Sequence, residues 1–370
     1  MDVWIIAQMM AAFIATYYVL TAGLNKKAGM TGIPDFGHAM FFAIGGIVVG
    51  HIAARVAAVI LAPELGISRA EAWRNVLEKN TQFMPIVNEH LAQHPLLSIM
   101  LIIFSIIVAM ILGGLLGWLA SYPALRLKGD YLAIMLLAAS EGLRVFVTYT
   151  TAIMGKTPTV GLTRPTLFAF TGNPPLWSTV FLVVVAVLVF VFAERFYNSP
   201  SGRLFRAVRD DEESAEALGK DVAKVRRDAM IIGSALAALA GAIASMNFWM
   251  TGSSIAPKTV FDRVLWTFWP WAIMIVGGMS SNRGTAVTTI IIGALIIGPI
   301  RIYKDSITRM LHVSALGIDP GYFANALEYL LIGFLILGML FFKPSGIIPE
   351  PPSWTLPRDK IREILRRATE

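Results

Sequence analysis

Two long runs without a charged residue, 176–193 and 229–257, lie on either side of a short charged stretch, 197–221. Each run approaches or exceeds the ~20 residues that a helix needs to cross the hydrocarbon core of a bilayer. Lipid offers the backbone no hydrogen-bond partner, so a crossing segment must be a helix or part of a closed barrel. The runs are continuous rather than alternating in hydrophobicity, which favours helices. We therefore predict an all-α fold, a polytopic bundle of membrane helices.

Composition excludes several classes of function. Hydrophobic residues make up 56% of the chain and charged residues only 15%, whereas a soluble domain carries roughly 25% charged residues. Cysteine is absent, which excludes a thiolate nucleophile and a cysteine-based metal site. The stretch 155–157 (Gly-Lys-Thr) resembles the end of a phosphate-binding loop, but Thr150 stands where that loop requires glycine. With no HExxH and no serine–histidine–acid set, we expect no catalytic, metal or cofactor residues and no ATPase site in this chain.

Apolar runs of suitable length predict about nine spans. They are approximately residues 3–24, 36–62, 96–120, 131–150, 176–194, 229–250, 264–280, 286–302 and 326–342. Lys and Arg concentrate in the loop 196–228 and in the tail 343–370, and loops rich in these residues stay in the cytoplasm. Four spans separate the two, so both assignments agree. Counting back places Lys26 and Lys27 in a cytoplasmic loop and the N-terminus outside.

This topology divides the chain into a transmembrane domain, 1–342, and a cytoplasmic tail, 343–370. Within the domain, 63–95 is expected to be an external insert and 196–228 a cytoplasmic coupling loop. The tail beyond Pro357 repeats apolar residues at helical spacing, which is typical of an amphipathic helix.

The external insert carries a helix-start signal. Ser68 and Glu71 have the spacing of a capping box, in which each side chain satisfies a free backbone N–H group of the other residue. We expect a short amphipathic helix after it, with Trp73, Val76 and Leu77 on the apolar side. Such a helix would rest on the bilayer surface or meet an external partner.

The charged stretch predicts a short helix over 210–219. Acidic side chains stabilise a helix N-terminus by roughly 0.3–1 kcal/mol, and Gly219 is expected to end the helix. The spacing of Glu213, Ala215 and Gly219, with Ser214 in place of one alanine, resembles the coupling-helix motif of ABC importer permeases. The alternative is an ordinary solvated helix. The residues expected to form the ATPase-coupling helix are Asp210, Asp211, Glu212, Glu213, Ala215 and Gly219.

A wider resemblance extends over most of the chain. The matching stretches are 22–46 (AGLNKKAGMTGIPDFGHAMFFAIGG), 125–134 (LRLKGDYLAI) with Glu141 and Arg144 after it, 201–219 (SGRLFRAVRDDEESAEALG) and 342–350 (FKPSGIIPE). Together they resemble branched-chain amino acid permeases of the LivM type. The chain departs from that pattern at Asn282 and Arg283, where family members usually have a glycine-rich stretch ending in proline.

The resemblance implies a multi-pass permease subunit of an ABC importer in the cell membrane of a prokaryote. It also implies the partners: a sister permease subunit, cytoplasmic ABC ATPase subunits, an external substrate-binding protein and the lipid bilayer, with no nucleic acid. The implied substrates are small amino acids, namely leucine, isoleucine and valine. Urea or short amides, which related permeases carry, stay open as the alternative.

Ionisable side chains at membrane depth are costly in lipid, so they face a cavity or a protein partner. Glu141 and Arg144 are one helical turn apart and can pair. They either line a passage for a zwitterionic solute or lock two helices together. Asp262 and Arg263 are expected at the outer interface. The residues expected along a translocation path are Asp35, His38, Gly129, Asp130, Tyr131, Glu141 and Arg144.

A secondary transporter driven by an ion gradient is the second hypothesis. It would use Asp35, His38 or Glu141 as proton or sodium sites. The charged stretch between two spans has no obvious role in such a protein, which favours the first hypothesis.

Overall fold

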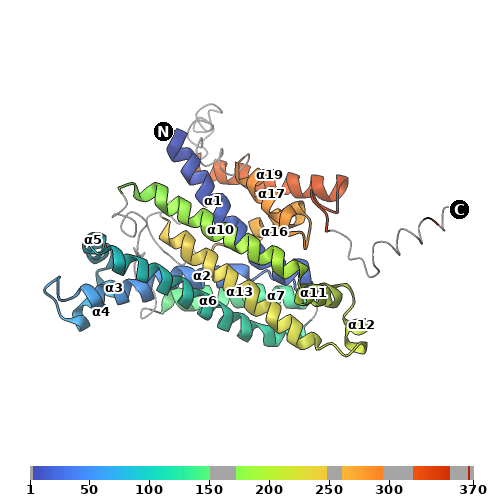
Figure 1. Ribbon diagram of the computed structural model, residues 1–370, viewed down its shortest axis with the longest axis horizontal. Helices are drawn as coiled ribbons and strands as arrows, with labels where there is room; N and C mark the ends of the chain where they lie inside the picture. Colours follow the sequence, from blue (N-terminus) through green and yellow to red (C-terminus); the bar gives the residue numbers. More distant parts are fainter. Residues whose placement is uncertain are drawn as a thin grey trace.

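A computed structural model describes residues 3–127, 129–150, 172–247, 261–294, 320–350 and 366. Every regular element in these ranges is a helix, which confirms the all-α prediction. Figure 1 shows the long helices lying along a common axis, with α6 beside α13 and α10 beside α1. The stretch 155–157 and the expected helix after Pro357 lie outside the described residues.

The helices carry the labels of Figure 1, in which η marks a π-helical turn with i→i+5 hydrogen bonds. Their bounds are α1 (Val3–Leu24), η1 (Asn25–Gly29), α2 (His38–Ile47), η2 (Val48–Ala53), α3 (Ala54–Leu61), α4 (Arg69–Glu78), α5 (Asn80–Ala92), α6 (Pro95–Arg126), α7 (Asp130–Tyr149), α10 (Pro174–Asn198), α11 (Pro200–Asp210), α12 (Glu212–Ala217), α13 (Val222–Met246), η4 (Val264–Phe268), α16 (Trp269–Gly277), α17 (Asn282–Ile292) and α19 (Pro320–Phe342).

Six helices in the described ranges are long and apolar enough to cross a bilayer. They are Trp4–Gly29, His38–Leu61, Pro95–Arg126, Asp130–Tyr149, Pro175–Asn198 and Val222–Met246. The pair Val264–Gly277 and Asn282–Ile292 adds a seventh if the two count as one span, because they bend by 117° at a short break. The chain is thus a multi-pass membrane bundle. The predicted number of nine is not confirmed, since the two separate spans expected at 264–280 and 286–302 are here a bent pair of short helices.

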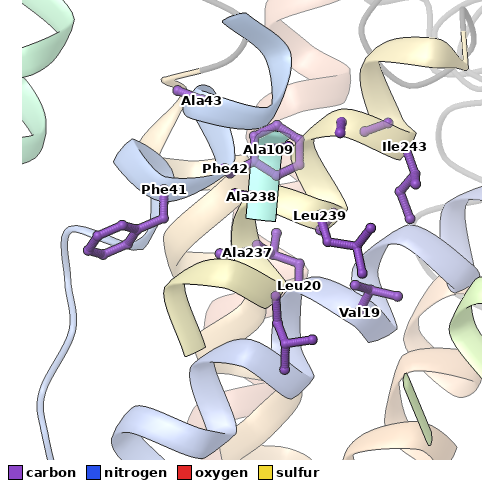
Figure 2. Packing of buried hydrophobic residues seen from close by; sticks show 14 of the residues in the cluster. Val19, Leu20, Phe41, Phe42, Ala43, Ala109, Ala237, Ala238, Leu239 and Ile243 are labelled. Atoms are coloured by element: carbon purple, nitrogen blue, oxygen red, sulfur yellow. The ribbon is translucent and has the colours of Figure 1, made fainter. Parts of the chain in front are cut away.

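Helix α13 forms the centre of the bundle and packs against α1, α2 and α6. Its small residues permit this, because a Cβ at Gly241 would overlap the backbone carbonyl of Phe42 on α2. Figure 2 shows Ala237, Ala238 and Leu239 of α13 among side chains from the neighbouring helices. Close approach through small residues is how membrane helices gain contact without a hydrophobic driving force.

The insert 63–95 folds onto one end of the bundle as α4 and α5, which pack against α3. The Ser68 hydroxyl accepts from the Glu71 N–H at 3.2 Å, so the predicted helix start is confirmed. Val76 is buried as expected, whereas Trp73 is half-exposed and stacks under the Arg55 guanidinium. Figure 1 places α4 and α5 at the opposite end of the bundle from α11 and α12. This separation agrees with the prediction that the two loops face opposite sides.

The segment after α19 returns to the bundle and docks on the end of α16. Ile347 N–H donates to the Val276 carbonyl at 2.8 Å, and Ile348 N–H donates to the Gly277 carbonyl at 3.2 Å. Gly346 has φ +84° and lies against Gly278, where a Cβ would overlap the backbone. The stretch 342–350 is therefore an ordered structural element rather than a free tail.

Candidate functional site

The charged stretch forms two helices rather than one. Asp210 is the last residue of α11, and Asp211 is the N-cap of α12. The Asp211 carboxylate accepts from the backbone N–H groups of Glu213 at 3.0 Å and Ser214 at 3.2 Å. The Ser214 hydroxyl donates to the same carboxylate, and these hydrogen bonds, the hydroxyl first, lower the pKa of Asp211. The predicted helix over 210–219 is corrected to 212–217, because Asp210 continues the preceding helix.

The C-terminal end of α12, Leu218 and Gly219, is an exposed tip, while the opposite side of the helix packs on the bundle. Leu218, directly after the helix, is 77% exposed, so its apolar side chain is free to meet a partner. Gly219 ends the helix with φ +73°, as predicted. Underneath, Ala215 is buried and Glu212 pairs with Arg226 of α13 at 2.9 Å. The tip is thus attached to the central helix of the bundle.

Glu350 connects α11 to the returning C-terminal segment. Its carboxylate lies 3.2 Å from an Arg206 guanidinium nitrogen and 2.8 Å from Arg209. Arg209 also donates to the Gly29 carbonyl at 2.9 Å. One arginine of α11 therefore contacts the end of η1 and the C-terminal segment together. Sequence reasoning missed Glu350, although it ends the quoted 342–350 motif.

A sealed ionic cluster lies between η1 and α2. Lys27 and Asp35 form an ion pair, and neither side chain has any exposed surface. His38 Nδ1 lies 3.1 Å from Asp35 Oδ2, the same oxygen that pairs with Lys27, and His38 Nε2 lies 3.0 Å from the Leu20 carbonyl oxygen. The prediction that Lys26 and Lys27 sit in a cytoplasmic loop is wrong for their surroundings: both are buried, because the π-turn η1 continues α1 through them.

An open ionic cluster lies on α7. Glu141 pairs with Arg144 at 2.7 Å, as the helical spacing predicted, and with Arg263 at 2.9 Å. The side chains of the three are 26–47% exposed. Glu141 is eleven residues after the start of α7 at Asp130, which is about 16 Å along a helix of about 30 Å. Arg263, which was expected at the outer interface, also takes part in this ion pair.

The segment between the two clusters is packed through backbone contacts and aromatic rings. Trp271 Nε1–H donates to the Asp35 carbonyl at 3.0 Å, and the Trp271 ring stacks on Phe36 with centroids 4.9 Å apart. A Cβ at Gly37 would overlap the Leu136 carbonyl of α7. The turn 33–37 therefore contacts both α7 and α16. A movement of either helix would shift this turn and, with it, the Asp35 side chain of the sealed cluster.

The remaining expected path residues stand apart from both clusters. Gly129, with φ +56°, precedes α7, and Asp130 and Tyr131 begin it. Tyr131 is 78% exposed. These three occupy one end of the helix, whereas Glu141 lies near its middle. The structure brings Asp35 together with His38, and Glu141 with Arg144, but it does not join all seven residues.

The departure at Asn282 and Arg283 has a structural explanation. The Tyr18 hydroxyl donates to Asn282 at 2.7 Å, and Arg283 pairs with Glu194 of α10 at 2.7 Å. Glu194, Asn282 and Arg283 line a cavity of about 220 Å³ together with Pro349. In the described residues no three His, Cys, Asp or Glu side chains gather as metal ligands would.

Comparison with known proteins adds independent findings. A family model described as "Branched-chain amino acid transport system / permease component" matches residues 6–340. A probable branched-chain amino acid transport permease protein LivM of Methanocaldococcus jannaschii is 36% identical over 361 residues, 96% of this chain and 97% of that protein. High-affinity LivM permease proteins of Escherichia coli and Salmonella typhimurium are 26% and 27% identical, over 65% and 63% of this chain and 56% and 54% of their own lengths. No solved structure matches significantly.

Proposed function

Because the chain belongs to the branched-chain amino acid transport permease family, we propose that it imports leucine, isoleucine or valine as one subunit of an ABC importer in a prokaryotic cell membrane. A permease component of an ABC-type transporter is what family membership supports directly. The substrate, the partner subunits and the membrane of residence go beyond it. The partners proposed are a sister permease, cytoplasmic ATPases and an external binding protein.

The observation that carries the proposal is the exposed tip of α12. A leucine that is 77% exposed at the end of a capped helix offers an apolar knob to a partner. The residues around it, Glu213, Glu216 and Lys220, are exposed and charged, which suits the polar rim of a protein interface. We place the ATPase contact here, on Asp211–Gly219.

The tip and the helix before it are linked to the rest of the bundle by ion pairs and a hydrogen bond. Force applied to α12 reaches α13 through the Glu212–Arg226 pair. Force applied to α11 reaches η1 and the C-terminal segment through Arg209. Since η1 carries Lys27, this second route ends at the sealed cluster. ATP-driven closure of the ATPases would thus shift contacts along both routes, and coupling requires that these contacts differ between the two transport states.

We propose that the end of the bundle opposite α12 faces the outside of the cell. Helices α4 and α5 cover that end and pack on α3. Their outward surface includes the half-exposed Trp73. We propose that the binding protein docks over these helices and releases its solute there.

A two-part experiment tests the proposal. The chain is co-expressed with its sister permease and ATPases and reconstituted in vesicles with the loaded binding protein. Uptake of labelled leucine is then measured with ATP inside or with a proton gradient alone. ATP-dependent uptake is expected; uptake that runs on the gradient without ATP would establish the secondary transporter instead.

Leu218→Glu tests the tip, and Leu218→Met, which keeps an apolar side chain of similar size, is its matched control. Leu218→Glu should lose ATPase-coupled uptake while the permease stays folded, whereas Leu218→Met should keep both. Equal uptake by the two variants would remove α12 from the ATPase contact.

A further inference from the structure

A cluster of three charged side chains beside α7 has an incomplete charge balance. Glu141 is one carboxylate shared by two guanidinium groups, Arg144 and Arg263. Both pairs use the Nε edge of the arginine, and within the described residues the terminal nitrogens of the two arginines donate to no other carboxylate. A guanidinium has five N–H donors in a fork that fits a carboxylate in a bidentate manner. The cluster thus has donors to spare.

Asp262, which is adjacent to Arg263, does not restore the balance. Its carboxylate accepts from the backbone N–H groups of Val264 at 2.9 Å and Leu265 at 3.0 Å. Its charge is therefore directed at the positive end of a helix. No ion pair joins Asp262 to either arginine among the described residues.

Exposure decides what this cluster can face. The three side chains keep 26–47% of their surface free, and Glu141 lies about 16 Å along α7. Ionised groups with free surface at that depth cannot face acyl chains, because the cost is several kcal/mol per charge. They therefore face a water-filled passage, a bound solute or a protein partner.

We propose that Glu141, Arg144 and Arg263 form a carboxylate-binding site in a water-filled passage. This rests on the proposed function and deepens it, because the site selects the substrate class. The spare guanidinium donors bind the α-carboxylate of an amino acid, and Glu141 stands next to them for the α-ammonium group. A neutral solute such as urea or an amide offers no anion to this site. The cluster therefore favours amino acids over the alternative substrates.

The chain has no cysteine, so single cysteines can report on the passage without background labelling. Ala138 lies one helical turn before Glu141 on the same face and is exposed. Leu188 of α10 is the matched control, since it is 63% exposed near the middle of its helix and lines an entirely apolar groove. Ala138→Cys and Leu188→Cys are compared in the complete transporter in vesicles.

Each variant is treated with an anionic and a cationic methanethiosulfonate reagent, and rates are normalised to those of a free thiol. We expect Ala138→Cys to react, with the anionic reagent favoured about tenfold, because a charged cleft concentrates counter-ions by at least this factor. Leu188→Cys should not react. In the double variant Ala138→Cys with Arg263→Gln, the ratio of the anionic to the cationic labelling rate should fall close to one. An unreactive Ala138→Cys, or one without anion preference, overturns the proposal.

Solute protection tests the substrate class. L-leucine should slow the labelling of Ala138→Cys, and L-leucinamide, which lacks the carboxylate, should not. Equal protection by both compounds overturns the assignment to a carboxylate. ATP-driven leucine uptake is measured on the same vesicles before labelling. Uptake that fails while anion preference persists would reject the proposed function and leave the anion site standing.

Discussion

Helices α13 and α7 are both long enough to span the membrane, yet the ion pairs beside them differ in exposure to solvent. Against α13, Lys27 and Asp35 are sealed with no exposed surface, and Lys27 also contacts Ser234 of α13. On α7, the pair of Glu141 and Arg144 stays partly open. A sealed pair is fixed by its surroundings, whereas an open cluster can exchange one partner for a solute. The difference separates a structural role from a binding role.

The cause lies in the small residues of α13. A Cβ at Gly233 would lie 2.5 Å from Lys27 Cγ, so its absence makes room for the lysine stem. On α7, a Cβ at Gly142 would meet nothing within 4 Å. Close packing excludes water on one helix and is missing on the other.

Removing one partner of the sealed pair should have the largest effect. Lys27→Met leaves Asp35 buried without its countercharge, and breaking a buried pair in this way costs about 3–5 kcal/mol. We expect a large drop in the thermal midpoint and in the monodisperse fraction of detergent-solubilised protein. Lys27→Met combined with Asp35→Asn should recover part of the loss, because the amide can still accept from Gly37 N–H. An unchanged midpoint for the single variant would show that the cluster is not sealed.

The next effect compares two glycines. Gly241→Ala on α13 forces a methyl group onto the Phe42 carbonyl, and overpacking of this kind costs about 1–3 kcal/mol. Gly142→Ala on α7 meets open space and should be neutral or stabilise by up to ~1 kcal/mol, since alanine is the better helix former. Thermal unfolding of both variants measures the contrast. Equal destabilisation would mean that α7 is as tightly enclosed as α13.

Substitutions in the open cluster should change the stability of the protein very little. Partly exposed ion pairs are worth about 0–1 kcal/mol, so Arg144→Gln and Arg263→Gln should fold normally while leucine uptake falls. The check is the thermal midpoint measured beside uptake for the same preparations. A stability loss as large as that of Lys27→Met would assign the cluster a structural role instead.

Asp211 is a fully water-exposed carboxylate and serves as the reference for the ionised groups beside α13 and α7. We expect the smallest effect on stability here. Because its pKa is lowered by the hydrogen bonds it accepts, chiefly from Ser214, its stabilisation of α12 is complete above the ordinary pKa of 3.8 and fades as the pH falls through the lowered pKa. Hydrogen exchange at the Glu213 and Ser214 amides should show protection lost only in acid. Asp211→Asn keeps an acceptor but does not titrate, so its protection should not change with pH. Protection lost already near neutral pH would contradict the assignment.

Local signals predicted the features that depend on local sequence. Hydrophobic runs located the long helices, Ser68 marked a helix start, and Gly219 marked a helix end. The pair of Glu141 and Arg144 followed from helical spacing alone. In each case the contact lies within four residues, so the chain near it is sufficient to define it.

Contacts between distant residues were not predictable from one sequence. Arg263 reaches Glu141 across 122 positions, and Glu350 reaches Arg206 across 144. The positive-inside rule assigned Lys27 to a loop because it counts charges without their partners, and the partner Asp35 lies beyond a π-turn that no local pattern marked. The 117° bend before Asn282 likewise depends on packing rather than on hydropathy.

The ion pairs of Glu350 with α11 have a practical consequence for work on this protein. Residue 350 is fixed beside Arg206 and Arg209 of α11. An affinity tag or fluorescent protein fused directly after residue 350 would start close to the surface proposed for the ATPases. A tag at the N-terminus, which Figure 1 shows away from α11 and α12, keeps that surface clear.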